Sequence, residues 1–235
     1  MSAASVLKAR IATTLMVGLA AMSLGVIASV AWPARARDVV DIRKLPMRFS
    51  WVPCPDHCRG WISAIGVITA DTPKAFEDFA HDRDLTGATM VLDSSGGSVN
   101  DTIALGRTWR NLGLLTTVGA TIDSPGSVSG TAAVIPDDAC ESMCGSRLLS
   151  GKVRYVPPGA RVRVHQIWMG DRANDARAAT YTAQDLMIVE RDIGRLAKYT
   201  FDMGGSGDLL ELALSIPPWE ALRQLSPEEL RRTHI

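Results

Sequence analysis

The apolar residues between positions 61 and 118 alternate between short continuous runs and runs with helical spacing. The continuous runs predict strands at 61–68, 88–93 and 114–118. A helix is expected to begin at Thr72 with Pro73 in its first turn, and a second is expected over 99–112 with Gly113 as its stop. Strands that alternate with helices in this way predict an α/β domain with largely parallel strands.

The second half of the chain is less regular, and its most unusual stretch is a glycine-, proline- and serine-rich segment over 119–138. This composition predicts a long loop, which in compact domains is often functional. Two strands are expected after it, at 152–155 and 161–167, separated by a Pro-Pro-Gly turn. The remaining predicted elements are helices at 141–149, 173–203, 208–214 and 226–232.

The N-terminus has the pattern of an export segment. Lys8 and Arg10 precede the uncharged, apolar residues 11–32, and Ala34-Arg35-Ala36 supplies a small-x-small cleavage site. Residues 1–36 therefore predict a signal peptide, with an uncleaved membrane anchor through 11–32 as the competing interpretation. Either outcome places the remainder in the periplasm or another extracytoplasmic space, at the inner membrane if the anchor is retained. A linker is expected over 37–50 and one folded domain over 51–235.

Composition excludes several other classes of protein. With 46% hydrophobic residues in 235, the chain can build one sizeable core. Lys plus Arg equals Asp plus Glu at 25 each, so no basic excess indicates a nucleic-acid partner. No motif calls for a cofactor.

The four cysteines are disulfide candidates because export places them in an oxidising compartment. Cys54, Cys58, Cys140 and Cys144 allow three pairings, and the sequence does not choose among them. A bridge from Cys140 or Cys144 to the earlier pair would tie the two regions of the chain together. The competing interpretation is a zinc site formed by the two Cys-x-x-x-Cys pairs, with His57 as a further ligand, but disulfides are favoured and no metal is expected.

Three features of the chain together suggest acyl-transfer chemistry. Ser142 lies at a predicted helix start, where the helix dipole favours negative charge. His165 lies near the end of a predicted strand, and Gly96-Gly97 forms a turn between a strand and a helix. Each has an ordinary structural role as well: a helix-start serine, a satisfied core histidine and a tight turn. Their combination predicts a nucleophile, a base and an oxyanion site.

The order of these motifs resembles the Clp protease proteolytic-subunit family of the crotonase superfamily, and most closely its exported relatives with a Cys-x-Ser-x-Cys motif. The similarity lies in Ser-x-Gly-Gly-x-Val at 94–99, in Ser142 between two cysteines, and in Val-His-Gln at 164–166. It covers residue 61 to the C-terminus. The resemblance implies a spiral of strand-strand-helix units, Ser142 as nucleophile, His165 as base, self-association, and oxyanion donors at Gly96 or Gly97 and at Met143.

The sequence departs from the family pattern at the acid that would orient the histidine. No aspartate precedes 225–230 at the expected place, where Glu220 is the nearest acid, and Asp202 and Asp208 are further candidates. Ser95 also replaces the usual proline before the glycine pair. Lys152, ten residues after Ser142, is an alternative base ranked below the histidine.

These observations predict an exported serine hydrolase, a peptidase with a peptide or protein substrate. The alternative is a catalytically silent binding protein that uses the same cleft for a peptide or acyl ligand, and the missing aspartate favours it. A third hypothesis, an enzyme acting on acyl-thioesters through the same oxyanion site, is disfavoured because export separates the protein from cytoplasmic coenzyme A.

Overall fold

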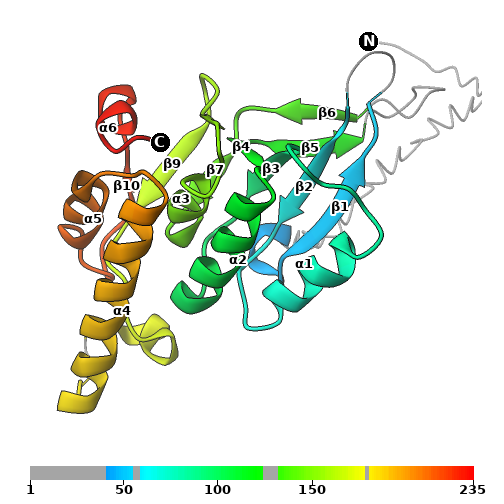
Figure 1. Ribbon diagram of the computed structural model, residues 1–235. Coiled ribbons are helices and arrows are strands. Elements are labelled where there is room, and N and C mark those ends of the chain that lie inside the picture. The colour runs from blue at the N-terminus through cyan, green and yellow to red at the C-terminus, as the bar shows by residue number, and fades with distance from the viewer. Residues whose placement is uncertain (1–40, 55–58, 124–131, 178–179) are drawn as a thin grey trace, which may run out of the picture. The chain divides into compact units, whose positions relative to one another are not determined.

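The computed structural model describes residues 41–54, 59–123, 132–177 and 180–235 (Figure 1). The predicted signal peptide or anchor therefore lies outside the described residues. Within those ranges, no helix is both long enough and apolar enough to cross a membrane.

The described part of the chain is a mixed α/β fold whose main sheet has five strands in the order β1-β2-β3-β4-β8. Strands β2, β3, β4 and β8 are parallel, and β1 runs antiparallel along β2 at the edge. The predicted parallel sheet is thus confirmed for its central strands. The strands are β1 Arg48–Val52, β2 Trp61–Ile65, β3 Thr89–Asp93, β4 Leu115–Val118 and β8 Arg154–Tyr155.

Two smaller sheets complete the β structure. One has the order β10-β9-β7, with β7 parallel to β9, and the other is the antiparallel hairpin β5-β6. The three-stranded sheet meets the main sheet through one isolated parallel bridge, Ser94 to Cys140. The strands are β5 Ala120–Asp123, β6 Ala132–Ile135, β7 Ala139–Glu141, β9 Arg161–Val164 and β10 Arg223–Gln224.

Figure 1 shows α1 and α2 side by side on one face of the main sheet, with α4 and α5 beside the smaller sheet. Aromatic rings of Phe49, Phe76 and Trp109 pack together under the first two helices, with centroids 5.2 to 6.2 Å apart. The helices are α1 Thr72–Ala80, α2 Val99–Asn111, α3 Met143–Leu148, α4 Ala183–Asp202, α5 Gly207–Leu214 and α6 Pro227–Arg232, with 3-10 turns at η1 Ile42–Lys44 and η2 Gly170–Asp175.

Helix boundaries follow local capping chemistry. The Ser98 side chain accepts from the Asp101 N–H at the start of α2, and α4 and α6 begin with reciprocal capping boxes. Pro73 stands in the first turn of α1, as expected from the sequence. The Ser98 cap fixes where α2 starts relative to the glycine turn that precedes it.

The sequence-based prediction missed the short strands β7 and β10, and it differs from the structure in three longer segments. The predicted loop over 119–138 contains both strands of the β5-β6 hairpin, whose connecting residues 124–131 lie outside the described part. The predicted linker over 37–50 includes η1 and most of β1, so the folded domain begins before Trp51. The single helix expected over 173–203 is shorter, beginning at Ala183 after η2.

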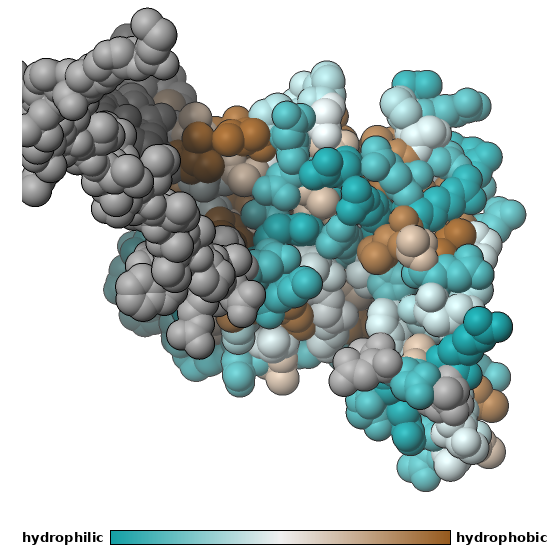
Figure 2. All heavy atoms as spheres, turned by 180° about the vertical axis from the view of Figure 1, so that it is seen from behind, coloured by the Kyte–Doolittle hydropathy of each residue, from teal (hydrophilic) through white to brown (hydrophobic). Residues whose placement is uncertain are grey.

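Exposed apolar side chains are divided among several places on the surface. Ile122, Val134 and Ile135 of the hairpin are 36 to 38% exposed, and Tyr155 of β8 is 60% exposed. Figure 2, seen from behind, shows hydrophobic residues in separate clusters between hydrophilic ones. The described atoms on that side do not form one continuous apolar face.

One charged side chain is fully buried without a hydrogen-bond partner. Arg147 of α3 has 0% exposure, its guanidinium lies 3.7 Å from the Trp109 ring centroid, and none of its three nitrogens has a partner among the described residues. Burial lowers its pKa to about 9. The ring attracts the cation, but a lone buried charge retains a desolvation cost.

We expect Arg147→Met to leave the free energy of unfolding unchanged or to raise it by up to about 2 kcal/mol, since Met fills similar volume without that cost. Urea unfolding measures this change. The matched control is Arg110→Met, because the Arg110 guanidinium donates to the Leu149, Ser150 and Met203 carbonyls. Its loss should lower the free energy of unfolding by about 1–3 kcal/mol. A larger loss for Arg147→Met than for the control would contradict the expectation.

Candidate active site

Ser142 occupies a strained turn between β7 and α3. Its φ of 54° and ψ of −124° fall where non-glycine residues are rarely found, and His234 is the only other described non-glycine residue with positive φ. The Ser142 N–H donates to the Arg163 carbonyl at 2.8 Å, and the Ser142 carbonyl accepts from the Gly145 N–H at 3.1 Å. Strain held in this way by surrounding bonds is typical of functional sites, and strand-turn-helix is the geometry of a nucleophile elbow.

A disulfide closes this turn covalently. Cys140 and Cys144 are bonded to each other, and both are fully buried. Cys54 is also disulfide-bonded, whereas Cys58 lies outside the described residues. The bridge from the nucleophile turn to the earlier cysteines is therefore absent, and so is the alternative zinc site, because cysteines in disulfides cannot act as thiolate ligands.

Gly96, the first residue of the glycine pair, lies directly against Ser142. Gly96 and Gly97 have φ of 97° and 133°, which side chains rarely permit. A Cβ on Gly96 would lie 2.7 Å from the Ser142 Cβ and 3.0 Å from the Met143 nitrogen. The sequence-predicted oxyanion turn and nucleophile are thus neighbours in space.

Two of the three predicted oxyanion donors are free. The Gly96 N–H already donates to the Ser94 Oγ at 3.1 Å, so Gly96 contributes space instead of a donor. Neither the Gly97 N–H nor the Met143 N–H has an acceptor among the described residues. Unpaired backbone donors beside a nucleophile are the parts of an oxyanion hole.

His165 follows β9 directly and is 8% exposed. Its ring contacts Trp168, with centroids 4.5 Å apart, and it lines one pocket together with Ser142. Burial lowers the pKa of His165, while hydrogen bonding to the Gln166 backbone and the charge of Glu141 act in the opposite direction. A lowered pKa favours the neutral imidazole, the form that a general base requires. The described residues show no hydrogen bond from the serine hydroxyl to this ring; such bonds are often loose in unliganded sites.

None of the predicted acids reaches His165. Glu220 is exposed after α5, and its side chain makes no ion pair or hydrogen bond within the described part of the chain. Asp202 pairs with Lys198 and Arg107, and Asp208 pairs with Arg232. Lys152, the alternative base, is exposed and does not line the pocket. Within the described ranges, no carboxylate forms a hydrogen bond or ion pair with His165.

The pocket beside Ser142 is narrow and mostly apolar. Its free space is about 20 Å³, enough for about one water molecule. Apart from Ser142, His165 and Ser146, it is lined by apolar residues, most of them from α4 and α5: Met143, Val164, Ile167, Ile193, Leu196, Leu209, Leu210, Ala213 and Leu214. Such a lining selects small apolar groups.

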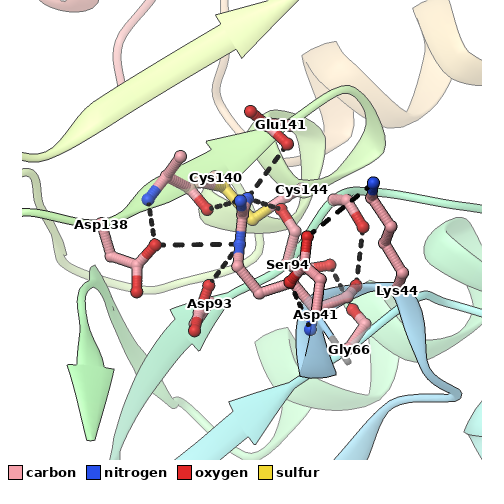
Figure 3. A network of polar contacts seen from close by, with 12 residues as sticks. Asp41, Lys44, Gly66, Asp93, Ser94, Asp138, Cys140, Glu141 and Cys144 are labelled. Atoms are coloured by element: carbon pink, nitrogen blue, oxygen red, sulfur yellow. Dashed lines mark hydrogen bonds and ion pairs between the residues drawn. A yellow bond between two sulfur atoms is a disulfide. The ribbon is translucent and has the colours of Figure 1, made fainter. Parts of the chain in front are cut away.

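A polar network that the sequence did not reveal lies behind the turn (Figure 3). Its centre is Arg43, whose guanidinium lies between Asp93, Asp138 and Glu141. The two aspartates and the glutamate flank the recognised motifs, but Arg43 lies in the segment predicted to be a linker. No pattern in the sequence indicated that Arg43 contacts these three acids, which lie far from it along the chain.

No protein-family model matches this sequence, and the curated proteins include no match to it.

Proposed function

We propose that the protein is an exported serine hydrolase, a peptidase in which Ser142 is the nucleophile and His165 the general base. The observation that carries the proposal is the strained Ser142 turn, closed by a disulfide and facing a glycine turn with a free donor. A solvated helix-start serine does not require this conformation. The resemblance to the Clp proteolytic-subunit family adds support. A spiral of strand-strand-helix units, which the resemblance implies, is part of the proposal.

The chemistry follows from the positions of the groups. His165 takes the hydroxyl proton of Ser142 as its oxygen bonds to the substrate carbonyl carbon, and the carbonyl π electrons move to oxygen. The Gly97 and Met143 N–H groups bind that oxyanion. Imidazolium then protonates the leaving amine as the C–N bond breaks, and water releases the acyl group by the same steps. Without an orienting acid, turnover should be slower by about 10⁴ than with a full triad.

Export and a peptide substrate are parts of this proposal. Disulfides persist in oxidising compartments, which supports the periplasm or another extracytoplasmic space. The narrow apolar pocket suits substrates with a small apolar side chain next to the scissile bond. Self-association stays a prediction from the resemblance.

The missing acid favours one competing function, a silent binding protein that holds a peptide or acyl ligand in the same pocket. Covalent labelling separates the two. We expect a fluorophosphonate to label the full chain, with the label mapped by mass spectrometry to the peptide containing Ser142. Ser146, which lines the same pocket, gives the matched control: Ser146→Ala should label normally. An unlabelled, oxidised wild-type protein would favour the binding protein.

A further inference from the structure

We propose that Arg43 is a positioning residue for the oxyanion site, holding the glycine turn and the nucleophile strand at a fixed separation. This inference rests on the proposed function for its catalytic meaning. Its structural basis is the position of Arg43 between two segments whose strands are joined by a single isolated bridge.

The joint between these two segments lies where the main sheet meets the three-stranded sheet. The glycine turn follows β3 of the first sheet, and Ser142 follows β7 of the second. Their strands meet through the isolated Ser94–Cys140 bridge, in which the Glu141 N–H donates to the Ser94 carbonyl at 2.9 Å. The Gly97 and Met143 N–H groups, the two proposed oxyanion donors, must bind the same oxygen. A relative shift of the two sheets by 1 Å would prevent this.

Arg43 binds both sides of this joint. On the β7 side, it donates to the Ala139 carbonyl at 2.8 Å and to the Glu141 carboxylate at 3.0 Å. On the β3 side, its guanidinium nitrogens lie 2.6 Å from an Asp93 oxygen and 3.4 Å from the Ser94 carbonyl. The planar guanidinium can bind several acceptors at fixed directions, which a lysine cannot reproduce.

The backbone of Arg43 adds a further bond to the turn. Its carbonyl accepts from the Ser95 hydroxyl at 2.6 Å, so the residue that replaces the usual proline binds the N-terminal segment. That segment is itself fixed, since the Leu45 carbonyl accepts from the Val67 N–H at 2.7 Å and the Met47 N–H donates to the Val67 carbonyl at 2.8 Å. The backbone that carries Arg43 is therefore held in place by hydrogen bonds to its neighbours.

The charges of the network make Arg43 necessary. Asp93, Asp138 and Glu141 all face its guanidinium, and their side chains are 4 to 19% exposed. The pKa of Asp93 is raised to about 7, chiefly by burial and then by the Asp138 carboxylate, while Arg43 acts in the opposite direction. Without the guanidinium, the Asp93 and Asp138 carboxylates would face each other across the joint. Among the described residues, Glu141 would keep only its ion pair with Arg163. The Ala139 carbonyl would lose its side-chain donor.

In the full chain, hydrogen exchange measures the stability of the joint, and fluorophosphonate labelling measures the reactivity of Ser142. In Arg43→Met, we expect hydrogen exchange at 94–98 and 139–143 to rise about tenfold, with β2 and α2 unchanged. Fluorophosphonate labelling at Ser142 should slow by about 10². Added guanidinium chloride at non-denaturing concentration should recover part of the labelling rate, which a general loss of stability would not allow. For Arg43→Lys, we expect a labelling rate and a hydrogen-exchange rate between those of the wild type and those of Arg43→Met.

Arg110→Lys is the matched control, since Arg110 also binds backbone carbonyls but at 149, 150 and 203. The Arg110→Lys variant should have a lower free energy of unfolding than the wild type and the same labelling rate. Unchanged exchange at 94–98 and 139–143 in Arg43→Met, or exchange raised throughout the domain, would overturn the positioning role. A wild-type protein that does not label would remove the proposed function, and the exchange result would still decide the role of Arg43.

Discussion

Replacing Ser142 by alanine should abolish fluorophosphonate labelling, and replacing His165 by alanine should slow it by about 10²–10⁴. The serine oxygen is the atom that would bond to phosphorus, so no other residue can substitute for it. His165 accelerates the step by accepting the hydroxyl proton. Its buried, neutral ring and its place in the same pocket support this role. Labelling rates at several probe concentrations measure both effects.

The same pair of variants tests whether the two residues act as a unit. In the double variant, no label should appear, and hydrolysis of an activated ester such as p-nitrophenyl acetate should be no slower than in Ser142→Ala alone. Lys152→Ala is the control, because that side chain is exposed and outside the pocket. Normal labelling in His165→Ala combined with loss in Lys152→Ala would replace the proposed base.

The second large effect is expected at Gly97. An added Cβ would lie 2.2 Å from the Ile68 carbonyl oxygen and 2.7 Å from the Ile68 nitrogen, at a φ of 133°. Both obstacles are backbone atoms, so the turn must move. Gly97→Ala should lower the free energy of unfolding by about 3–5 kcal/mol and remove labelling with it. Urea unfolding and labelling measure the two losses.

Gly113→Ala separates this clash from the general cost of a positive φ. Gly113 has a φ of 64°, but no atom lies within 4 Å of its ideal Cβ position. Its substitution should cost only about 1–2 kcal/mol and leave labelling unchanged. Equal losses in the two variants would mean that the conformation matters at Gly97 and the contact with Ile68 does not.

Local patterns predicted the fold well where each element is decided by its own residues. The runs that become β3 and β4, and the capped helix α2, need only periodicity and a terminal signal. The β5-β6 hairpin was missed because the serine- and glycine-rich residues 124–131 between its two short strands are typical of loops. Its strands are held by cross-strand pairing and by contacts such as the Trp61 indole N–H donating to Thr121.

The candidate site was predictable in its parts but not in its connections. Ser142, Gly96 and His165 stand at or just beyond the ends of predicted elements. The structure places Gly96 against Ser142 and puts Ser142 and His165 in the lining of one pocket. Glu220 was chosen by its place along the chain, which says nothing about distance in space. Arg43 was missed because an arginine in an aperiodic segment is ordinarily solvated, and only tertiary contacts distinguish this one.

The Cys140–Cys144 bond encloses a short stretch of chain, with a sequence separation of 4. Short disulfide loops restrict the unfolded chain less than long ones do, so this bond adds comparatively little to global stability. Its main effect is on the shape of one turn. A reduced preparation can therefore melt near the usual temperature and elute as a normal monodisperse sample while the backbone at Ser142, the proposed nucleophile, has lost its native conformation. For this protein, sample quality has to be judged by thiol content as well as by folding.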